Sequence, residues 1–546
     1  MKKNGFIEGT LIATSIIIII KILGMLYVIP FYQIVGSDGT ALYSYAYNIY
    51  LIFLSISSAG LPDAIAKIIS EYNTLGYNDA KIRAYKIGRN LITIISIVSF
   101  LILFVFAEEI GKFIIGNLKG TNTYKDIAFV IRCISPSVLL IPFLSITKGY
   151  LQGHKFISAS SMSQLIEQVI RILIILVGSF LVRKTLNGTL SLAVGIALTG
   201  AFFGGLGAYI YLRRVIKKEK LLNVEKTNEN ISNKEILKKI VIYALPFVVI
   251  SIITTIYNET DQILVLRTLE SLNVDPHEVE YIASSIATLA PKICMVINAM
   301  VMGLTMSLVP TIVSAFAKKD HEEVENKINK ALAMIVFISL PLSIGVSILS
   351  HSIWTLFYDT NPIGGEILSL AAYSALCANI YLTISAICQS VNKYSSVYKV
   401  SGLGFLINAL LDVPIMLFYN KIGIPTYLGS LTASIIGFSA SAFVGLILLR
   451  KESKYSYREA FELWCKTLIP AISMLVILLI INKVFVFNDY RRSSAIIKIL
   501  INFVIGATTY IVISIKLGLL DKIMGKKTVA TLVKKCTFGL IKLKED

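Results

Sequence analysis

The chain lacks the sequence features of an ATP-driven protein. No G-x-x-x-x-G-K-[ST] phosphate-binding loop occurs, because Gly525-Lys526-Lys527-Thr528 has no glycine at the required upstream position. No segment outside the apolar runs is large enough to form a domain that hydrolyses ATP. Any energy that the protein uses must then come from an ion gradient or from the membrane potential, which supplies about 2.3 kcal/mol per charge per 100 mV.

Residues suited to catalysis or metal binding are also scarce. The four histidines are scattered near predicted loops, and no Ser-His-Asp set is apparent. The six cysteines show no C-x-x-C spacing, so we interpret them as small buried apolar residues. The segments 108–126 and 265–281, which are among the less apolar parts of the chain, carry no catalytic set either. We therefore predict that the protein is not an enzyme.

Long apolar runs dominate the sequence. Of its 546 residues, 55% are hydrophobic, and the mean hydropathy is +0.74. A helix of about 20 apolar residues crosses a bilayer, whereas the alternating pattern of a membrane β-barrel is absent. We predict an all-α integral membrane protein of fourteen spans, at 10–32, 41–62, 87–107, 127–148, 157–182, 189–212, 240–264, 282–309, 330–350, 367–390, 397–419, 427–449, 467–487 and 495–515.

The formal net charge of +19 follows the predicted topology. With the N-terminus inside, most of the 52 lysines and arginines fall in inner loops, as the positive-inside rule requires. This asymmetry predicts a multi-pass protein of the bacterial cytoplasmic membrane, with both termini in the cytoplasm and an attraction to the anionic inner leaflet. No basic domain with interleaved aromatic residues lies outside the membrane, so nucleic-acid binding is not expected.

The first twelve spans form two related halves. Ser70 and Lys86 of the first half correspond to Ser314 and Lys330 of the second, in both cases at an offset of 244 residues. Two parallel six-helix lobes of this kind place a transport site near midplane between them. The predicted domains are an N-lobe (1–212), a cytoplasmic linker (213–239), a C-lobe (240–450), spans thirteen and fourteen (451–517) and a basic cytoplasmic tail (518–546).

Several motifs carry a resemblance to a known family. Residues 148–153 read KGYLQG and residues 163–171 read SQLIEQVIR; a first-span motif around Lys21 and the segment SLVPTI at 307–312 add to them. This set resembles the multidrug/oligosaccharidyl-lipid/polysaccharide flippase superfamily, and within it the branch of stage V sporulation protein B and the lipid II flippases. The resemblance implies fourteen helices in two lobes around a central cavity, and export of undecaprenyl-diphosphate-linked sugars.

The sequence also departs from that family. Members often carry a second arginine six residues after the first-span cation, where this chain has Tyr27. Some carry arginines in span two, where this chain reads Phe53-Leu54-Ser55. The cavity is therefore expected to be less cationic, and the identity of the glycan, a vegetative or sporulation role and the oligomeric state stay open.

Cations inside the spans are the candidate ligands for an anionic cargo. Lys21 lies near the middle of span one, where an ammonium costs about 3 kcal/mol or more unless it faces a polar cavity or a partner. Lys292 follows Pro291, which loosens the helix locally, and the resemblance places an arginine within one residue of it. The alternatives are a packing ion pair for Lys21 and an outer-surface lysine for Lys292.

Span five carries a charged pair. Glu167 and Arg171 lie four residues apart and share one helix face, in the favourable Glu-first order. A structural ion pair and a substrate contact both fit this spacing. Arg132 in span four is a further candidate cavity cation for the cargo, together with Lys21, Lys292 and Arg171. It is nearer the outer surface, where the alternative is a side chain that extends to water.

A candidate sodium site lies in spans seven and eleven. Asn408 and Asp412 share one face of span eleven, and their oxygen atoms suit a hard cation. In the resembled lipid II flippases, this spacing works together with an aspartate of span seven, for which Asp261 is the match and Glu259 the rival. A polar helix end at the outer interface is the alternative for span seven. We expect no other cofactor or metal.

Two transport functions compete. A lipid-linked oligosaccharide flippase requires a cationic cavity, whereas a multidrug antiporter of the same superfamily requires an acidic one for cationic drugs. The four in-span cations, against few in-span acids, favour the anionic cargo. A scaffold without transport would leave these charges unexplained.

Overall fold

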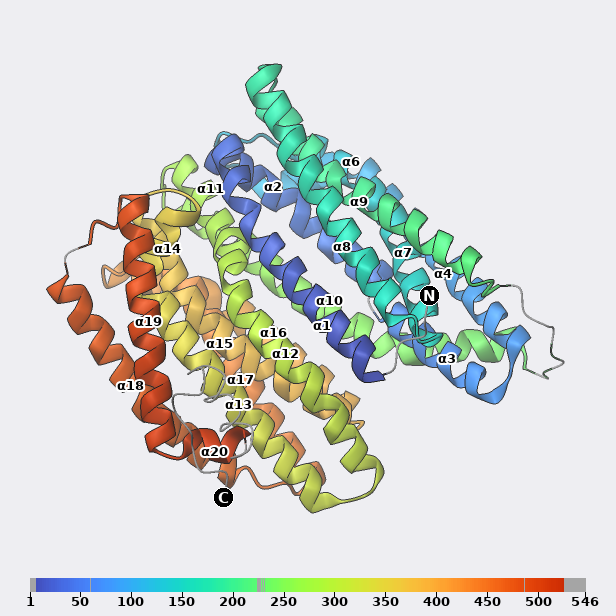
Figure 1. Cartoon of the computed structure of the whole chain (residues 1–546). Coiled ribbons are helices and arrows are strands. Elements are labelled where there is room, and N and C mark those ends of the chain that lie inside the picture. Colours follow the sequence, from blue (N-terminus) through green and yellow to red (C-terminus); the bar gives the residue numbers. More distant parts are fainter. Residues whose placement is uncertain are drawn as a thin grey trace. The chain divides into compact units, whose positions relative to one another are not determined.

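The computed structural model describes residues 6–58, 60–222, 227, 229, 231–485 and 487–524, without the side chains of residues 6–14, 246, 254, 258 and 303–310. Within these residues the chain is helical and contains no strand, which confirms the predicted all-α class. It divides into two compact units, Met1–Ile293 and Cys294–Asp546 (Figure 1).

Thirteen stretches of the described residues are long and apolar enough to cross a membrane. The first, Ser15–Leu75, has 61 residues, which is about 90 Å of helix against a hydrocarbon core of about 30 Å. It contains the first two predicted spans. Its direction changes at Gly36, whose φ of 71° and ψ of −171° are accessible to glycine and to almost no other residue. The thirteen stretches thus overlap all fourteen predicted spans.

In the first unit, several helices of the N-terminal half pack against one another. α1 packs on α8, α8 on α9, and α3 on both α4 and α7 (Figure 1). Gly149 permits the close approach of α7 to α3, because a Cβ there would lie 2.3 Å from the Pro62 carbonyl oxygen. The helices and π-helical segments are α1 (Phe6–Leu26), α2 (Val28–Ser58), α3 (Leu61–Leu75), α4 (Asn78–Val105), α5 (Ala107–Ile115), α6 (Tyr124–Ile134), α7 (Pro136–Gly153), α8 (Ile157–Leu173), η1 (Ile174–Gly178), η2 (Leu181–Thr185), α9 (Leu190–Lys218), α10 (Asn233–Ser271), α11 (Pro276–Ser284) and η3 (Ser285–Leu289).

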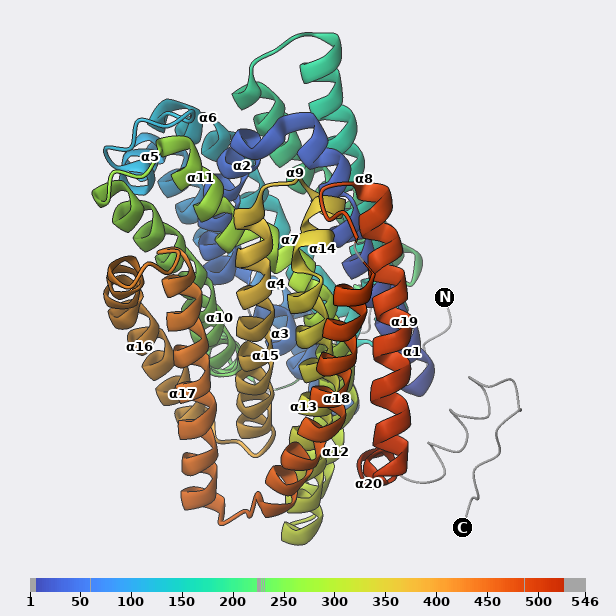
Figure 2. The same cartoon turned by 90° about the vertical axis from the view of Figure 1, so that its left-hand side faces the viewer.

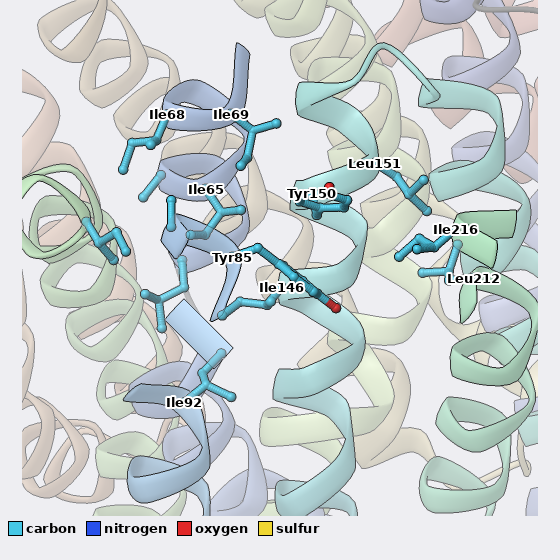
Figure 3. Packing of buried hydrophobic residues seen from close by; sticks show 14 of the residues in the cluster. Ile65, Ile68, Ile69, Tyr85, Ile92, Ile146, Tyr150, Leu151, Leu212 and Ile216 are labelled. Carbon is cyan, nitrogen blue, oxygen red and sulfur yellow. The ribbon is translucent and has the colours of Figure 1, made fainter. Parts of the chain in front are cut away.

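A large apolar core holds α3, α4, α7 and α9 together. Ile65, Tyr85, Tyr150, Leu212 and Ile216 belong to one buried cluster (Figure 3). The Tyr85 and Tyr150 rings lie 4.5 Å apart between their centroids. Close van der Waals packing of such side chains holds helices together in a bilayer, where lipid tails are as apolar as the core. This core includes residues of α7, the helix that carries Lys148.

The second unit is a bundle in which α17 packs on α15 and α16, and α13 packs on α15 and α18 (Figure 2). α18 and α19 lie against each other. The Tyr510 hydroxyl donates a hydrogen bond of 2.6 Å to the Phe337 carbonyl and so ties α19 to α13. The elements are α12 (Ala290–Ala317), which begins in the first unit, α13 (His321–Ile348), α14 (Ser350–Phe357), α15 (Pro362–Ser390), α16 (Tyr394–Lys421), α17 (Leu428–Ser453), α18 (Arg458–Val484), α19 (Arg492–Lys516) and α20 (Leu519–Met524).

Helices extend into the predicted linker from both sides. α9 continues to Lys218 and α10 begins at Asn233. Parts of the linker, most of the predicted basic tail and the side chains of the SLVPTI segment up to Pro310 lie outside the described residues. The predicted lobe boundaries and cytoplasmic termini stay predictions.

A neutral polar network is buried where α2 meets α10 and η3. The Ser44 and Thr288 hydroxyls lie 2.6 Å apart, at a sequence separation of 244 residues. The side-chain amide of Gln262 donates a hydrogen bond of 2.9 Å to the Ser44 hydroxyl. The side-chain amide of Asn48 donates one of 2.9 Å to the side-chain oxygen Oε1 of Gln262. Because each polar group finds a partner, the network can stay buried without a large desolvation cost.

Candidate functional site

Glu167 on α8 is the acidic centre of a charged cluster in the first unit. Its Oε1 lies 2.5 Å from Arg171 Nη2, and its Oε2 lies 3.0 Å from Lys148 Nζ on α7. The Glu167 and Lys148 side chains are each 13% exposed and Arg171 is 19% exposed. One carboxylate therefore serves two largely buried cations, and the cluster keeps a net positive charge.

Lys148 was not predicted as a site residue, because the sequence showed it only as part of the KGYLQG motif. It lies 19 residues before Glu167 and on a different helix. Spacing on one helix face could predict the Glu167–Arg171 contact, but no local pattern connects residues on neighbouring helices.

Lys292 lies among tyrosine rings. Its Nζ is 5.8 Å from the ring centroid of Tyr27 and 5.7 Å from that of Tyr47. The Tyr47 ring stacks on Tyr43 with centroids 5.3 Å apart, and Tyr50 follows at 5.9 Å from Tyr47. Cation–π contacts of this kind stabilise an ammonium by about 0.5–2 kcal/mol. They leave its positive charge in place.

The tyrosines are a second feature that the sequence analysis missed. Residues 43, 47 and 50 are spaced by four and three positions, which places them on one face of α2. Tyr27, noted above as a departure from the family pattern, supplies a ring beside Lys292. The helical spacing of these aromatic residues in the sequence could have predicted that they lie together.

Lys21 lies near this group on α1. Its side chain is half-buried, at the border between the buried Gly24 and Tyr27 and the exposed Ile18 and Ile22. Its ammonium is close enough to that of Lys292 for the two charges to repel each other. Lys21 has no ion pair or hydrogen bond with any side chain that the structure describes. The packing ion pair considered from the sequence is therefore not seen among these residues.

The cluster as a whole is positively charged. Lys292 also experiences repulsion from Arg171, which connects the α8 pair to the tyrosine group. Among the described residues, Glu167 is the only carboxylate that pairs with any of Lys21, Lys148, Arg171 and Lys292. We refer to these four cations and Glu167 as the cation cluster.

Small residues and π-helical turns shape the helices around the cluster. A Cβ on Gly204 of α9 would lie 2.5 Å from the Glu167 carbonyl oxygen, so only glycine permits this approach to α8. The π-helical segment η1 directly follows α8, and η3 directly precedes α12, which carries Lys292. Such π-helical turns within long helices are frequent at functional sites.

Arg132 forms its ion pair with a residue outside the cation cluster. Its Nη2 lies 3.2 Å from Glu108 Oε1 on α5, with side chains 38% and 44% exposed. A pair this exposed contributes about 0–1 kcal/mol. The contact is that of a surface ion pair.

The residues predicted to bind sodium are distributed over both units. Asn408 and Asp412 are fully buried on α16, whereas Asp261 and Glu259 are buried on α10. Neither carboxylate oxygen of Asp412 forms a hydrogen bond within the described part of the chain, although Ser430 of α17 lies beside it. A buried carboxylate without donors suits a cation. The described residues contain no group of three or more His, Cys, Asp or Glu that could hold a metal ion.

Replacing Glu167 with glutamine should destabilise the first unit. The change leaves Lys148 and Arg171 without a counter-charge in a largely buried place, and breaking such a pair costs about 3–5 kcal/mol. We expect a lower midpoint of thermal unfolding for Glu167→Gln in detergent micelles. Glu462→Gln, which breaks the exposed Glu462–Lys466 pair on α18, is the matched control and should change the midpoint little. Equal midpoints for the two variants would contradict the structural role of Glu167.

Two family models match the chain. The model described as polysaccharide biosynthesis protein matches residues 6–316, and the MatE model matches residues 246–413. Among curated proteins, the lipid II flippase MurJ of Bacillus subtilis is 28% identical over 542 residues, which cover 96% of this chain and 97% of that protein. Stage V sporulation protein B of the same organism is 23% identical over 64% of this chain and 65% of that protein.

Solved structures of transporters share the fold. A lipid II flippase MurJ in an inward closed conformation superimposes with a TM-score of 0.64 at 18% identity, covering 93% of this chain and 99% of that one. A multidrug resistance MATE family transporter in an inward-facing conformation gives a TM-score of 0.63 at 13% identity, covering 82% and 98%. At these identities the likeness concerns the fold alone.

Proposed function

This chain belongs to the polysaccharide biosynthesis protein family, and on that premise we propose that it is a flippase for a sugar linked to a polyprenyl diphosphate. The cargo would move from the inner to the outer leaflet of the bacterial cytoplasmic membrane. Lipid II or a related cell-wall precursor has the required chemistry. The relatives that carry flippase and sporulation names support this class of cargo.

The observation that carries the proposal is the excess of positive charge in the cation cluster. Lys148 and Arg171 share Glu167, while Lys21 and Lys292 have no described carboxylate partner, and all four lie in helices that are apolar enough to span a membrane. Intramembrane cations are costly and usually serve a function. A diphosphate supplies the missing negative charge, and it suits the planar fork of Arg171 and the point charges of the lysines.

The residues would then act by binding and orientation. Lys21 and Lys292, which lack a described carboxylate partner, would contact the diphosphate oxygens. Arg171 would be held in place by Glu167 and present its free donors to the same group. The tyrosine faces beside Lys292 would exclude water, which strengthens the electrostatic attraction. Rocking of one lobe against the other would expose the cargo to the opposite leaflet.

Energy would come from an ion gradient or the membrane potential. Asn408, Asp412 and Asp261 would hold a sodium ion, for which the donor-free carboxylate of Asp412 is suited. A bound cation would supply the counter-charge that the carboxylate lacks. We place both termini in the cytoplasm, with lobes at 1–212 and 240–450.

A cation antiporter is the second candidate. The match of the MatE model to residues 246–413 favours it, and the buried acids Glu259, Asp261 and Asp412 lie within that segment. The charge of the cation cluster opposes it, since the cluster would repel a cationic drug. The two functions therefore differ in the sign of the cargo.

The test compares cargo of opposite charge. We expect the wild-type protein to rescue growth of a strain depleted of its lipid II flippase. We also expect the purified protein to bind a polyprenyl-diphosphate sugar in preference to ethidium. Rescue failure despite normal expression, with binding retained, would point to a different polyprenyl-linked glycan. Export of ethidium without binding of the diphosphate lipid would overturn the proposal in favour of the antiporter.

A further inference from the structure

A pocket at the C-terminal end of α9 is lined by basic residues that the proposed function does not use. It has a volume of about 430 Å³. Its lining includes Arg213, Arg214, Lys217 and Lys220, together with Tyr209 and Ile210. We call it the α9 pocket. It shares no residue with the cation cluster.

No carboxylate among the residues that the structure describes pairs with the cations of the α9 pocket. All four basic side chains are exposed. Glu219 is the only acidic residue between positions 213 and 222. The positive-inside tendency explains basic residues at a helix end, but it does not explain why they gather around a cavity.

The inner wall of the pocket is rigid. Ile216, which lines the pocket, belongs with Leu212 to the buried core around Tyr150 (Figure 3). The Tyr150 hydroxyl donates a hydrogen bond of 2.8 Å to the carbonyl of Leu221, which follows the helix. The chain around the basic residues is therefore held by packing and by a side-chain hydrogen bond. A preorganised site loses less conformational entropy when it binds a ligand.

Lys220 occupies a backbone position that favours glycine. Its φ is 51°, and the amide of Lys220 bonds to the Lys217 carbonyl while that of Leu221 bonds to the Ile216 carbonyl, both at 3.2 Å. This is the Schellman arrangement, in which the left-handed residue is usually glycine. A lysine there carries a conformational cost relative to glycine.

We propose that the α9 pocket binds the phosphate of an anionic membrane phospholipid. α9 has 29 residues, which is about 43 Å of helix against a hydrocarbon core of about 30 Å. Its charged residues begin only at Arg213, so the end of the helix that extends beyond the core is the C-terminal one. The pocket therefore lies at the depth of lipid headgroups. Tyr209 and Ile210 offer an apolar wall to the first part of an acyl chain, and the four cations match a phosphate. Basic pockets beside membrane helices commonly bind such headgroups.

The test measures lipid binding to the purified full-length protein by native mass spectrometry. Phosphatidylglycerol is the probe and phosphatidylcholine is the neutral comparison. The variant Arg213→Gln/Arg214→Gln/Lys217→Gln removes three cations of the pocket. Each surface cation contributes about fivefold to the affinity for an anionic lipid, so we expect the Kd for the tightest phosphatidylglycerol to rise by about a hundredfold.

A second triple variant controls for bulk charge. Lys318→Gln/Lys319→Gln/Lys330→Gln removes three exposed cations from the second unit, and it should leave the tight phosphatidylglycerol site unchanged. Equal loss in both variants, or no loss in either, would overturn the proposal. Tight binding of inorganic phosphate, or displacement of phosphatidylglycerol by undecaprenyl diphosphate at the pocket, would also overturn it, because the ligand would then be a free anion or the cargo.

Lys220→Gly separates binding from folding. Glycine relieves the left-handed backbone, so the variant should unfold at a higher temperature than the wild type, and it should still bind phosphatidylglycerol several-fold more weakly. A destabilised protein cannot produce this combination. Unchanged phosphatidylglycerol binding in a stabilised Lys220→Gly would contradict a role for this cation. Cargo flipping by these variants is a separate measurement, so a failure of the lipid proposal leaves the flippase proposal standing.

Discussion

Lys21→Gln and Lys292→Gln are each expected to reduce flipping of a diphosphate-linked lipid by about tenfold or more, and the double variant by about a hundredfold. Each substitution removes a hydrogen bond between charged groups, which contributes about 1.5–3 kcal/mol. Neither lysine has a carboxylate partner among the described residues, so its removal leaves no opposing charge unpaired. The effect should therefore fall on cargo binding while thermal stability is retained.

The measurement is a flipping assay in proteoliposomes, in which a fluorescent polyprenyl-diphosphate sugar becomes accessible to a quencher. Arg132→Gln is the matched control, because it removes a cation whose only described carboxylate partner is the exposed Glu108. Lys292→Arg should keep much of the activity, since it keeps the charge. If Arg132→Gln impairs flipping as strongly as Lys21→Gln, the cluster has no special role in binding the diphosphate.

Asp412→Asn is expected to abolish stabilisation by sodium. In the wild type, both carboxylate oxygens of this fully buried residue lack a described donor, so a bound cation removes an unfavourable buried charge. At a sodium concentration about 100 times the Kd, binding stabilises the folded protein by about 2.7 kcal/mol. The midpoint of thermal unfolding should rise with sodium chloride in the wild type and stay constant in Asp412→Asn.

Choline chloride at the same ionic strength separates sodium binding from charge screening. Asp261→Asn and Glu259→Gln then decide between the two candidate ligands of α10. Substitution of the true ligand should abolish the rise of the unfolding midpoint with sodium, whereas the other substitution should leave it in place. A sodium response that persists in Asp412→Asn would exclude this residue as a ligand. Such a result would assign the sodium site to other residues.

The fold class could be predicted from the sequence because apolar runs of about 20 residues have few alternatives in a bilayer. The way in which the first two spans are connected could not be predicted from the sequence. A loop was expected between residues 32 and 41, whereas α2 continues through this region with a single non-helical residue, Gly36. Hydropathy reports how long an apolar segment is, but it does not report where a helix bends.

The charged site was accessible to sequence reasoning only where its members share a helix. Glu167 and Arg171 are one turn apart, and the structure places them in contact. Lys148 and the tyrosines of α2 come from other helices, and packing alone brings them to Arg171 and Lys292. Asp261 and Asp412 belong to different units, so their predicted joint action on sodium rests on the experiments above.

The contact between Ser44 and Thr288 bears on the predicted repeat. Their separation of 244 residues equals the offset of Ser314 from Ser70 and of Lys330 from Lys86, so we expect the two hydroxyls to be equivalent positions of the repeat. In a two-fold arrangement, a residue can touch its own copy only at the axis. The pseudo-two-fold axis that relates the predicted halves would therefore pass through this pair of hydroxyls.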